Sequence, residues 1–275
     1  MKDETLYSLR EAAEQLGLHY MTIYRYIRTG RLEAQKSGPH WVIPARELQR
    51  FQQGAMATDG TKPTRPRRGP GAIERLVGRL LAGDENGAWG IAQEMLAGGA
   101  SPKQVYLGLF VPALQRVGQL WEQGKITVAD EHRASGVTQR LVGRMGPLFR
   151  PRGPRVGTVI VGTPAGETHA LPTALVADIL RGEGFDVVDL GADVPAAAFA
   201  EYALGIEGLV AVAIVVTVAR HRRNMGILLR TLRDAGVTAP IMVGGAGVTE
   251  GEARALGADH WTPDVDAVVR ILAAR

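Results

Sequence analysis

From Arg155 onward, the chain alternates short, continuously apolar runs with segments of helical periodicity. Strands that are buried on both faces of a parallel sheet read as unbroken apolar runs, and the intervening helices supply the crossover connections. The apolar runs are VGTVIVGT, FDVVDLG, GLVAVAIVVTV, PIMVGG and ADHW. This alternation predicts a doubly wound, flavodoxin-like parallel sheet over residues 151–275.

The residues before this region are organised differently, so we expect a multidomain α and α/β protein. Residues 73–150 carry helix-period apolar positions interrupted at AGDENG, AGGASP and EQGKIT, which predicts a four-helix bundle. Residues 54–72 are rich in Gly, Pro and Thr and contain a basic cluster. Because that composition cannot bury a core, it predicts a flexible linker. Residues 1–53 then form a separate small helical module.

The N-terminal module begins with a helix-capping signal, Ser8 followed three residues later by Glu11. Two short helices joined by a glycine turn, the second of them basic, fit helix-turn-helix geometry, and a β-hairpin wing follows with its turn at Ser37-Gly38. A small interaction domain with solvated arginines would give the same charge pattern. In a helix-turn-helix, the side chains available to DNA would be Tyr20, Thr22, Tyr24, Arg25 and Arg28, with Lys36 and His40 as weaker phosphate contacts.

One histidine follows the first predicted strand, in the loop GTPAGETHA, where His169 stands two residues after Glu167. Loops at the carboxyl ends of parallel strands form the ligand sites of such sheets. The glycines do not have dinucleotide-binding or P-loop spacing. His169 could supply one axial ligand to a metal held by a macrocycle, with Glu167 orienting its ring. It could equally cap the next helix or face solvent.

The composition narrows the function classes. The chain has 275 residues, no cysteine and a net charge of +4, which excludes disulfides, thiolate zinc sites and iron–sulfur clusters. No apolar run is long enough to span a bilayer and no signal core is present, so we expect a cytoplasmic location and no membrane partner. Because no nucleophile–base set is evident, we expect the chain not to be an enzyme.

The N-terminal segment SLREAAEQLGLHYMTIYRYIRTGRLEAQKSGPHWVIP resembles the winged helix-turn-helix of the MerR and excisionase-like families. The resemblance implies a double-stranded DNA operator as the partner.

The histidine loop resembles the cobalamin-binding Rossmann-type domain, whose signature is Asp/Glu-x-His-x-x-Gly, then Ser-x-Leu, then Gly-Gly. Glu167-Thr168-His169 matches the first part and Gly244-Gly245 the last. The resemblance implies a cobalamin whose cobalt takes His169 as its lower axial ligand, with the glycines leaving room for the nucleotide tail. The other residues expected at the cofactor are Gly166 and Thr217, the latter as a partial substitute for the serine hydroxyl.

Two positions depart from this signature. Pro172 stands where Gly is expected, and Ala213 stands where Ser is expected. These departures keep open a regulator of the same fold that binds another tetrapyrrole or no cobalamin.

The predicted bundle contains Trp121, nine further residues, and then Glu131-His132. This spacing resembles the cap of the CarH-like family of cobalamin-dependent, light-sensing repressors, in which these residues cover the upper axial group of adenosylcobalamin. Glu122 stands where some relatives have a second histidine, so His132 is the candidate upper-face ligand.

The expected function is therefore a transcriptional regulator, a repressor that senses light or cobalamin state and forms a homo-oligomer controlled by its cofactor. The alternative is a corrinoid methyl-carrier protein of a methyltransferase system, which shares the bundle and the Rossmann-type domain.

Overall fold

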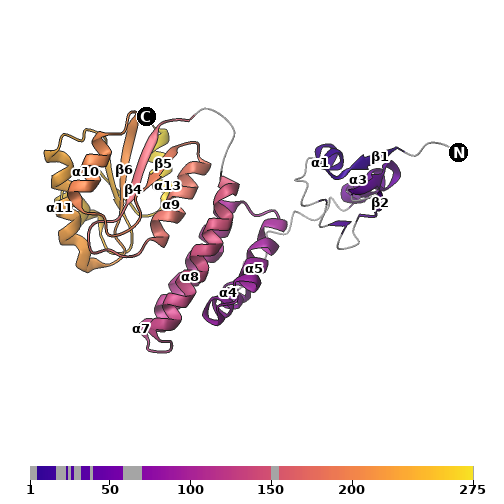
Figure 1. The fold of residues 1–275 in the computed structure, drawn as a ribbon, viewed down its shortest axis with the longest axis horizontal. Coiled ribbons are helices and arrows are strands. Elements are labelled where there is room, and N and C mark those ends of the chain that lie inside the picture. The colour runs from indigo at the N-terminus through magenta and orange to yellow at the C-terminus, as the bar shows by residue number, and fades with distance from the viewer. Residues whose placement is uncertain are drawn as a thin grey trace. The chain divides into compact units, whose positions relative to one another are not determined.

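The computed structural model describes residues 5–16, 23, 26–27, 32–37, 40–57, 70–149 and 155–274 (Figure 1). These residues form two compact units, one made by the elements before residue 68 and the other by the elements from residue 70 onward. None of the described helices is long and apolar enough to cross a membrane. The cytoplasmic location stays a prediction.

The first unit is a small helical domain with a three-stranded antiparallel sheet of order β1-β3-β2. Its elements are β1 (Leu6–Ser8), α1 (Leu9–Leu16), β2 (Gln35–Ser37), β3 (His40–Pro44) and α3 (Ala45–Ala57). The expected capping box is present, since the backbone N–H of Ser8 donates to Glu11 and that of Glu11 donates to the Ser8 hydroxyl. Strands β2 and β3 form the expected wing, while β1, which pairs with β3, was not predicted.

The expected linker over residues 54–72 is too long at both ends. Helix α3 continues to Ala57, and α4 (Pro70–Ala82) begins at Pro70. Ala and Met are strong helix formers, and proline is favoured in the first turn of a helix, so both ends of the segment join helices. Residues 58–69 lie outside the described residues.

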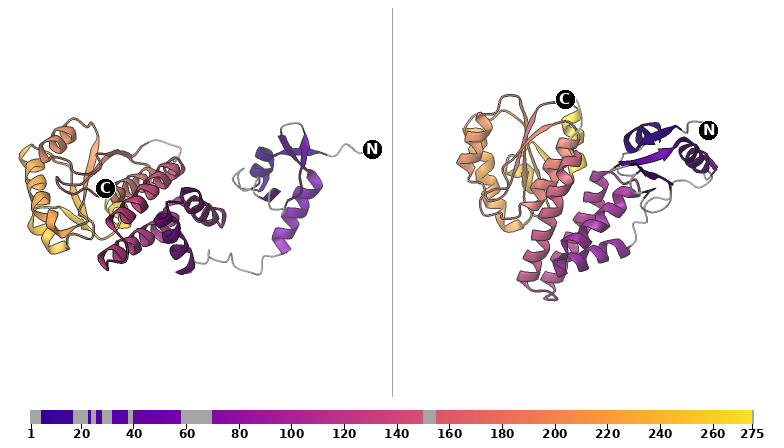
Figure 2. Two further views of the ribbon diagram at one scale, coloured as in Figure 1. Left: turned by 60° about the horizontal axis from the view of Figure 1, so that its bottom comes forward. Right: turned by 45° about the vertical axis from the view of Figure 1, so that its right-hand side comes forward.

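The four-helix bundle is confirmed. Helices α4, α5 (Glu85–Ala97), α7 (Val111–Glu122) and α8 (Val128–Met145) share one apolar core. Helix α7 is entered through α6 (Pro102–Val105) and the π-helical turn η1 (Tyr106–Phe110), and α8 is followed by the 3-10 turn η2 (Gly146–Phe149). In Figure 2 the purple-to-magenta helices run beside one another in both views.

The doubly wound sheet is also confirmed. Its five parallel strands have the order β5-β4-β6-β7-β8, the flavodoxin-like order. The strands are β4 (Thr158–Gly162), β5 (Asp186–Asp189), β6 (Leu209–Val215), β7 (Ile241–Gly244) and β8 (His260–Thr262). The helices are α9 (Leu171–Gly182), α10 (Ala196–Leu204), the turn η3 (Ala219–His221), α11 (Arg222–Asp234), α12 (Glu250–Ala255) and α13 (Val265–Ala273).

Helices cover both faces of this sheet (Figure 1). On one face, α10, α11 and α12 pack against alternate strand residues, Ile160 among them. On the other face, α9 and α13 pack against the intervening residues, such as Val159 and Val161. The bundle then packs on the outside of α9 and α13, because Leu175, Ile179 and Val265 belong to the core of the bundle.

Polar contacts tie the bundle to this layer at one end. The buried Tyr106 hydroxyl donates to Asp178 of α9 at 2.8 Å, and Arg181 donates to the other oxygen of Asp178 at 2.9 Å. Lys103 pairs with Glu183 and Asp266, at the end of α9 and the start of α13. Burial and the bond to the Asp178 carboxylate raise the pKa of Tyr106, which keeps its proton in this contact.

Candidate functional site

The candidate site lies where β4 and β6 end. The chain leaves β4 for α9 on one face of the sheet and leaves β6 for α11 on the other face. Such a reversal opens a crevice at the carboxyl edge, where doubly wound proteins bind their ligands. His169 lies on the first of these two loops and Thr217 on the second.

Glu167 is fully buried, and both of its carboxylate oxygens are engaged. One oxygen accepts the backbone N–H of Thr217 at 2.9 Å, the Thr217 hydroxyl at 2.6 Å and the backbone N–H of Val218 at 3.1 Å. The other bonds Nδ1 of His169. Burial alone would raise the pKa of Glu167, but the hydrogen bonds from Thr217 and His169 outweigh it and lower the pKa to about 2. The carboxylate is therefore ionised at neutral pH.

The Glu167 carboxylate determines which ring nitrogen of His169 is available. Nδ1 lies against Glu167 and 3.0 Å from the Thr217 hydroxyl, while 49% of the side chain remains exposed. A carboxylate at Nδ1 holds the proton there and leaves the lone pair on Nε2. Among the described residues, no hydrogen bond occupies Nε2, so it can ligate a metal.

This donor set fits one kind of metal group. Within the described part of the chain, no cluster of three or more His, Asp or Glu side chains could hold a metal ion alone. A single imidazole with its Nδ1 held by a carboxylate fits a metal whose other positions are filled by a macrocycle. The residues present therefore fit the expected lower-face ligation of a cobalamin cobalt, and that role of His169 stays a prediction.

The glycines at the end of β7 permit a close approach of backbone. A Cβ on Gly245, whose φ is +106°, would lie 2.2 Å from the carbonyl oxygen of Val216, and one on Gly244 would lie 2.7 Å from that of Thr262. Gly245 therefore lets the loop after β7 pack against the loop that carries Thr217, and Gly244 lets the end of β7 pack closely against β8. Their expected role beside a nucleotide tail stays a prediction.

The two departures from the cobalamin signature have clear places in the fold. Pro172 lies in the first turn of α9, where a missing N–H costs no intrahelical hydrogen bond. Ala213 is buried in β6 and packs with the residues covered by α9 and α13. The Thr217 hydroxyl, expected to replace the missing serine at the tail, instead bonds Glu167 and His169.

The bundle residues expected at the upper face are at the ends of helices, as predicted. Trp121 lies half-exposed near the end of α7. Glu131, in the first turn of α8, bonds Nδ1 of His132 at 2.6 Å and accepts from Ser135 at 2.7 Å. Among the described residues, no hydrogen bond or ion pair links these side chains to the His169 loop.

The direction of α8 nevertheless shows where Glu131 and His132 lie relative to the His169 loop. Gln139 of α8 and Ala170 line one small hollow of 230 Å³ at the start of α9. The turns of α8 that precede Gln139 therefore extend past the start of α9, toward the side on which the strands end (Figure 1). Glu131 and His132 lie on that extension.

Three residues that sequence reasoning missed hold the backbone of the histidine loop. The Thr163 hydroxyl donates to the carbonyl of Glu167, Asp193 accepts from the backbone N–H of Gly166, and Asn224 donates to the carbonyl of Ala165. Asp193 comes from the loop after β5 and Asn224 from the first turn of α11, both far along the chain. No local spacing signals them, because their contacts depend on strand order.

Most of the expected DNA contacts cannot be placed. Tyr20, Thr22, Tyr24, Arg25 and Arg28 lie outside the described residues. Lys36 lies over the ring of Trp41, with its Nζ 5.6 Å from the ring centroid, and the backbone of His40 pairs with Ser37 in the wing.

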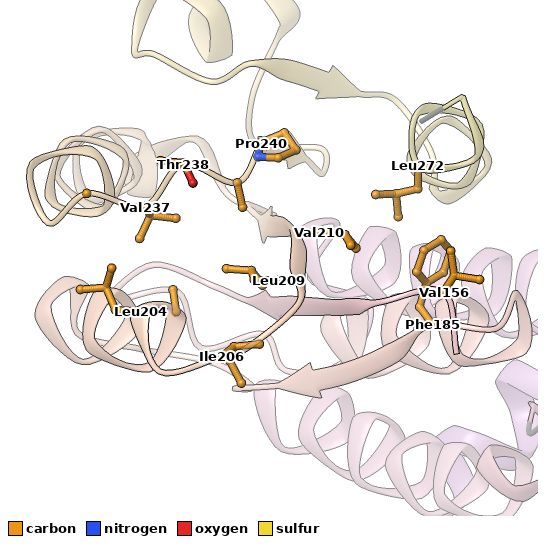
Figure 3. Close-up of a pocket in the computed structure, with 13 residues that line it drawn as sticks. Val156, Phe185, Leu204, Ile206, Leu209, Val210, Val237, Thr238, Pro240 and Leu272 are labelled. Carbon is orange, nitrogen blue, oxygen red and sulfur yellow. The ribbon is translucent and has the colours of Figure 1, made fainter. Parts of the chain in front are cut away.

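A larger hollow lies away from this chemistry. Figure 3 shows a cavity of 680 Å³ at the opposite edge of the sheet, where β4, β6 and β7 begin. Its lining includes Val156, Phe185, Leu209 and Pro240 and contains no ionisable side chain.

Three known families match the chain, one for each of its parts: the N-terminal domain, the helical bundle and the sheet domain. Residues 72–145 and residues 157–273 each match a B12 binding domain family, and residues 6–56 match a helix-turn-helix domain family. The B12 matches cover the bundle and the sheet that carry the candidate site. The cofactor is therefore a cobalamin or a related corrinoid.

Proteins with similar sequences are corrinoid proteins. The chain is 33% identical over 198 residues to trimethylamine corrinoid protein 2 of Methanosarcina acetivorans, a match that covers 70% of this chain and 90% of the relative. It is 32% identical over 197 residues to the trimethylamine corrinoid protein of Methanosarcina barkeri, covering 70% and 90%. The monomethylamine corrinoid protein of Methanosarcina barkeri has the same fold, with a TM-score of 0.64 at 20% identity over 73% of this chain and 96% of that one.

These relatives correct the expected function. The sequence predicted a CarH-like, light-sensing transcriptional regulator that binds a DNA operator as a cofactor-controlled oligomer. The matching proteins are corrinoid proteins instead. The predictions of a transcriptional regulator, of a DNA operator as its partner and of a cofactor-controlled oligomer on that operator were therefore wrong. The W-x9-E-H and E-x-H spacings were interpreted as contacts of the cofactor, and those roles stay predictions. The chain belongs to the family of B12-binding corrinoid proteins, with a helix-turn-helix domain in front of its corrinoid-binding part.

Proposed function

We propose that this chain is a corrinoid methyl carrier, which receives a methyl group from one methyltransferase reaction and gives it up in another. The observation that carries the proposal is the match to trimethylamine corrinoid protein 2 over 90% of that protein's length. The names of these relatives point to methylated amines as the class of methyl donor.

A bound cobalamin supplies a cobalt whose upper face can accept and release a methyl group. The chain's own residues prepare the lower face. His169 offers Nε2, Glu167 holds the proton at Nδ1, and Thr217 holds the Glu167 carboxylate in place with its N–H and its hydroxyl. An ionised carboxylate at Nδ1 would make Nε2 a stronger donor to a bound cobalt and would hold the ring proton at Nδ1.

The bundle is proposed to face the upper side. Trp121 presents an exposed indole, and Glu131 holds the ring of His132 from Nδ1. His132 remains the candidate upper-face ligand. The adenosyl form expected from the CarH-like resemblance stays a prediction, and a carrier requires an upper group that exchanges. We infer that the chain is not itself an enzyme, and that separate methyltransferases catalyse both transfers.

The test uses an extract of cells from the protein's source that lack this chain. Purified, cobalamin-loaded chain is added with trimethylamine carrying a ¹⁴C label in its methyl groups, and the chain is re-isolated and counted. We expect label on the wild-type chain, at least tenfold less without cobalamin, and slower labelling of His169→Ala. Absence of label from trimethylamine, dimethylamine and monomethylamine alike would show that the chain is not a carrier of methyl groups from amines.

A further inference from the structure

Asp193, in the loop after β5, has an unusual backbone conformation. Within the described part of the chain, it is the only residue other than glycine with a positive φ, at 57°. Aspartate tolerates this left-handed region better than most residues but still at a cost, and such strain persists where the surrounding contacts demand it.

The contacts of Asp193 all converge on the loop that leads to His169. Its Oδ1 accepts the backbone N–H of Gly166 at 2.6 Å. Its own backbone N–H donates to the carbonyl of Glu167 at 2.9 Å and lies 3.0 Å from the Thr163 hydroxyl, which itself donates to that carbonyl at 2.7 Å. One residue in the left-handed conformation thus holds the loop backbone at two successive residues, Gly166 and Glu167.

These contacts go beyond ordinary pairing between neighbouring loops. The two loops already continue the β4–β5 pairing through a bridge between Pro164 and Val194, where the backbone N–H of Val194 donates to Thr163. That bridge is made before the loop reaches Gly166. Asp193 adds the contacts at Gly166 and Glu167, the residues just before His169.

The loop is therefore held from two sides that act on different groups. The β6 side, through Thr217 and Val218, binds the carboxylate of Glu167. The β5 side, through Asp193, binds the backbone of Gly166 and Glu167, and Thr163 of the loop itself donates to the same Glu167 carbonyl. The carboxylate contacts select the ring nitrogen that carries the proton, whereas the backbone contacts fix the point from which the His169 side chain projects.

We propose that Asp193 is a positioning residue for axial ligation: it fixes the His169 loop from the β5 side so that Nε2 reaches the metal of a bound corrinoid. This inference rests on the proposed lower-ligand role of His169. Asp193 makes none of the hydrogen bonds to the imidazole, so it acts through the backbone.

The test uses cobinamide, a corrinoid that lacks the nucleotide base, with the full chain. After reduction to the cobalt(II) form, a three-line nitrogen splitting in the electron paramagnetic resonance spectrum can arise only from a nitrogen that the protein supplies. Spectra at saturating cobinamide measure the ratio of ligated to unligated corrinoid separately from binding affinity. Thermal unfolding of the corrinoid-free chain measures folding.

The variants separate the side chain of Asp193 from its backbone conformation. Asp193→Ala loses both the acceptor and the tolerance for positive φ, and we expect about a tenfold smaller ratio of ligated to unligated corrinoid. Asp193→Gly keeps the conformation without the acceptor, so we expect an intermediate ratio. Asp193→Asn keeps both and should rescue ligation. Asp234→Ala, at the end of α11, is the matched surface control.

The possible outcomes distinguish a failure of the positioning role of Asp193 from a failure of the lower-ligand role of His169. Splitting in the wild type that is equally strong in Asp193→Ala and Asp193→Gly would overturn the positioning role and leave His169 ligation intact. No splitting in the wild type, or splitting that survives in His169→Ala, would overturn the lower-ligand assignment and with it this inference. A ratio that merely follows the melting temperature across the variants would also count against a positioning role.

Discussion

At the scale of single residues, the site depends on a carboxylate that is buried and still charged. Glu167 has no exposed surface, and its carboxylate is bonded by three backbone N–H groups, one hydroxyl and one imidazole. Such charge-assisted bonds are stronger than neutral ones, and removing the charge from their centre leaves donors without an acceptor.

This arrangement predicts a pH dependence of folding for the corrinoid-free chain. The pKa of Glu167 is lowered from 4.5 to about 2, so its contribution to stability is complete above pH 4.5 and is lost as the pH falls toward 2. The contribution is on the order of 3 kcal/mol at most. Urea unfolding at pH 7, 4 and 3 should show Glu167→Gln less stable than wild type at pH 7, with the difference shrinking toward pH 3. A difference that does not change with pH would contradict the assigned pKa.

Gly245 allows a second test at this scale. Gly245→Ala would place a methyl group 2.2 Å from the Val216 carbonyl oxygen at a φ of +106°. We expect a loss of at least ~2 kcal/mol in unfolding free energy and weaker corrinoid binding, since Val216 precedes Thr217. Gly251→Ala in α12 has open space at its Cβ and should change stability by less than about 1 kcal/mol. Equal urea midpoints for the two variants would contradict this account.

At the scale of elements, the π-helical turn η1 places Tyr106 between the bundle and α9. The ring of Tyr106 packs against Phe110 and Phe149, and its hydroxyl reaches Asp178. An inserted π turn shifts the side chains that follow it and is often found at functional positions in helices. Tyr106 is the first residue of this turn, and its ring is buried in the bundle core while its hydroxyl reaches Asp178 of the neighbouring layer.

Tyr106→Phe should weaken the contact between the bundle and α9 without leaving a cavity in the bundle core. The variant removes the hydroxyl but leaves Asp178 bonded to Arg181, so we expect a loss of about 1–3 kcal/mol by urea unfolding. Tyr202→Phe, at a half-exposed position on α10, is the control and should be neutral. Unchanged stability of Tyr106→Phe would show that this contact depends on apolar packing alone.

Most of the helices and strands could be predicted from the sequence. The contacts that hold the His169 loop could not, because they depend on the order of the strands in the sheet. Apolar runs and helical periodicity indicate β4 to β8 and the bundle, and E-x-H places Glu167 beside His169. The contacts of Asp193 and Asn224 lie 27 and 59 residues from their partners and exist because β5 and β6 flank β4. Local patterns carry no information on that order. Strand β1 was missed because three residues are too few to show an alternation.

At the scale of the whole molecule, two compact units carry separate cores. The relatives match over 90% of their length, which leaves too little of them for a module the size of residues 6–56. The helix-turn-helix domain is thus an addition to the corrinoid-binding part. The sequence motifs predicted the class of cofactor correctly but not the partner, because the residues they name were interpreted as contacts of the cofactor alone.

The corrinoid-binding part should therefore function without the first unit. A chain that begins at Pro70 should bind aquacobalamin with a dissociation constant within about twofold of the full chain, because all the predicted ligand and cap residues lie after that point. A spectral titration measures this, with His169→Ala in both lengths as the control. A much weaker affinity of the shortened chain would show that the first unit contributes to the corrinoid site.

Helix α8 contacts the sheet layer toward its C-terminal end, so a small rotation there would move its N-terminal end by a larger distance. Helix α8 meets the sheet layer near Gln139, which lines a hollow with Leu171 of α9, and just past its end, where Gly146 lies beside Asp178 of α9. The part before Gln139 extends about 16 Å beyond that support, since each helical residue rises 1.5 Å. A tilt of about 10° at the support would therefore carry the end of α8 through about 3 Å, close to the thickness of one aromatic ring. Small adjustments among Tyr106, Asp178 and Lys103 would thus be amplified into a displacement of Glu131 and His132 near the start of α8.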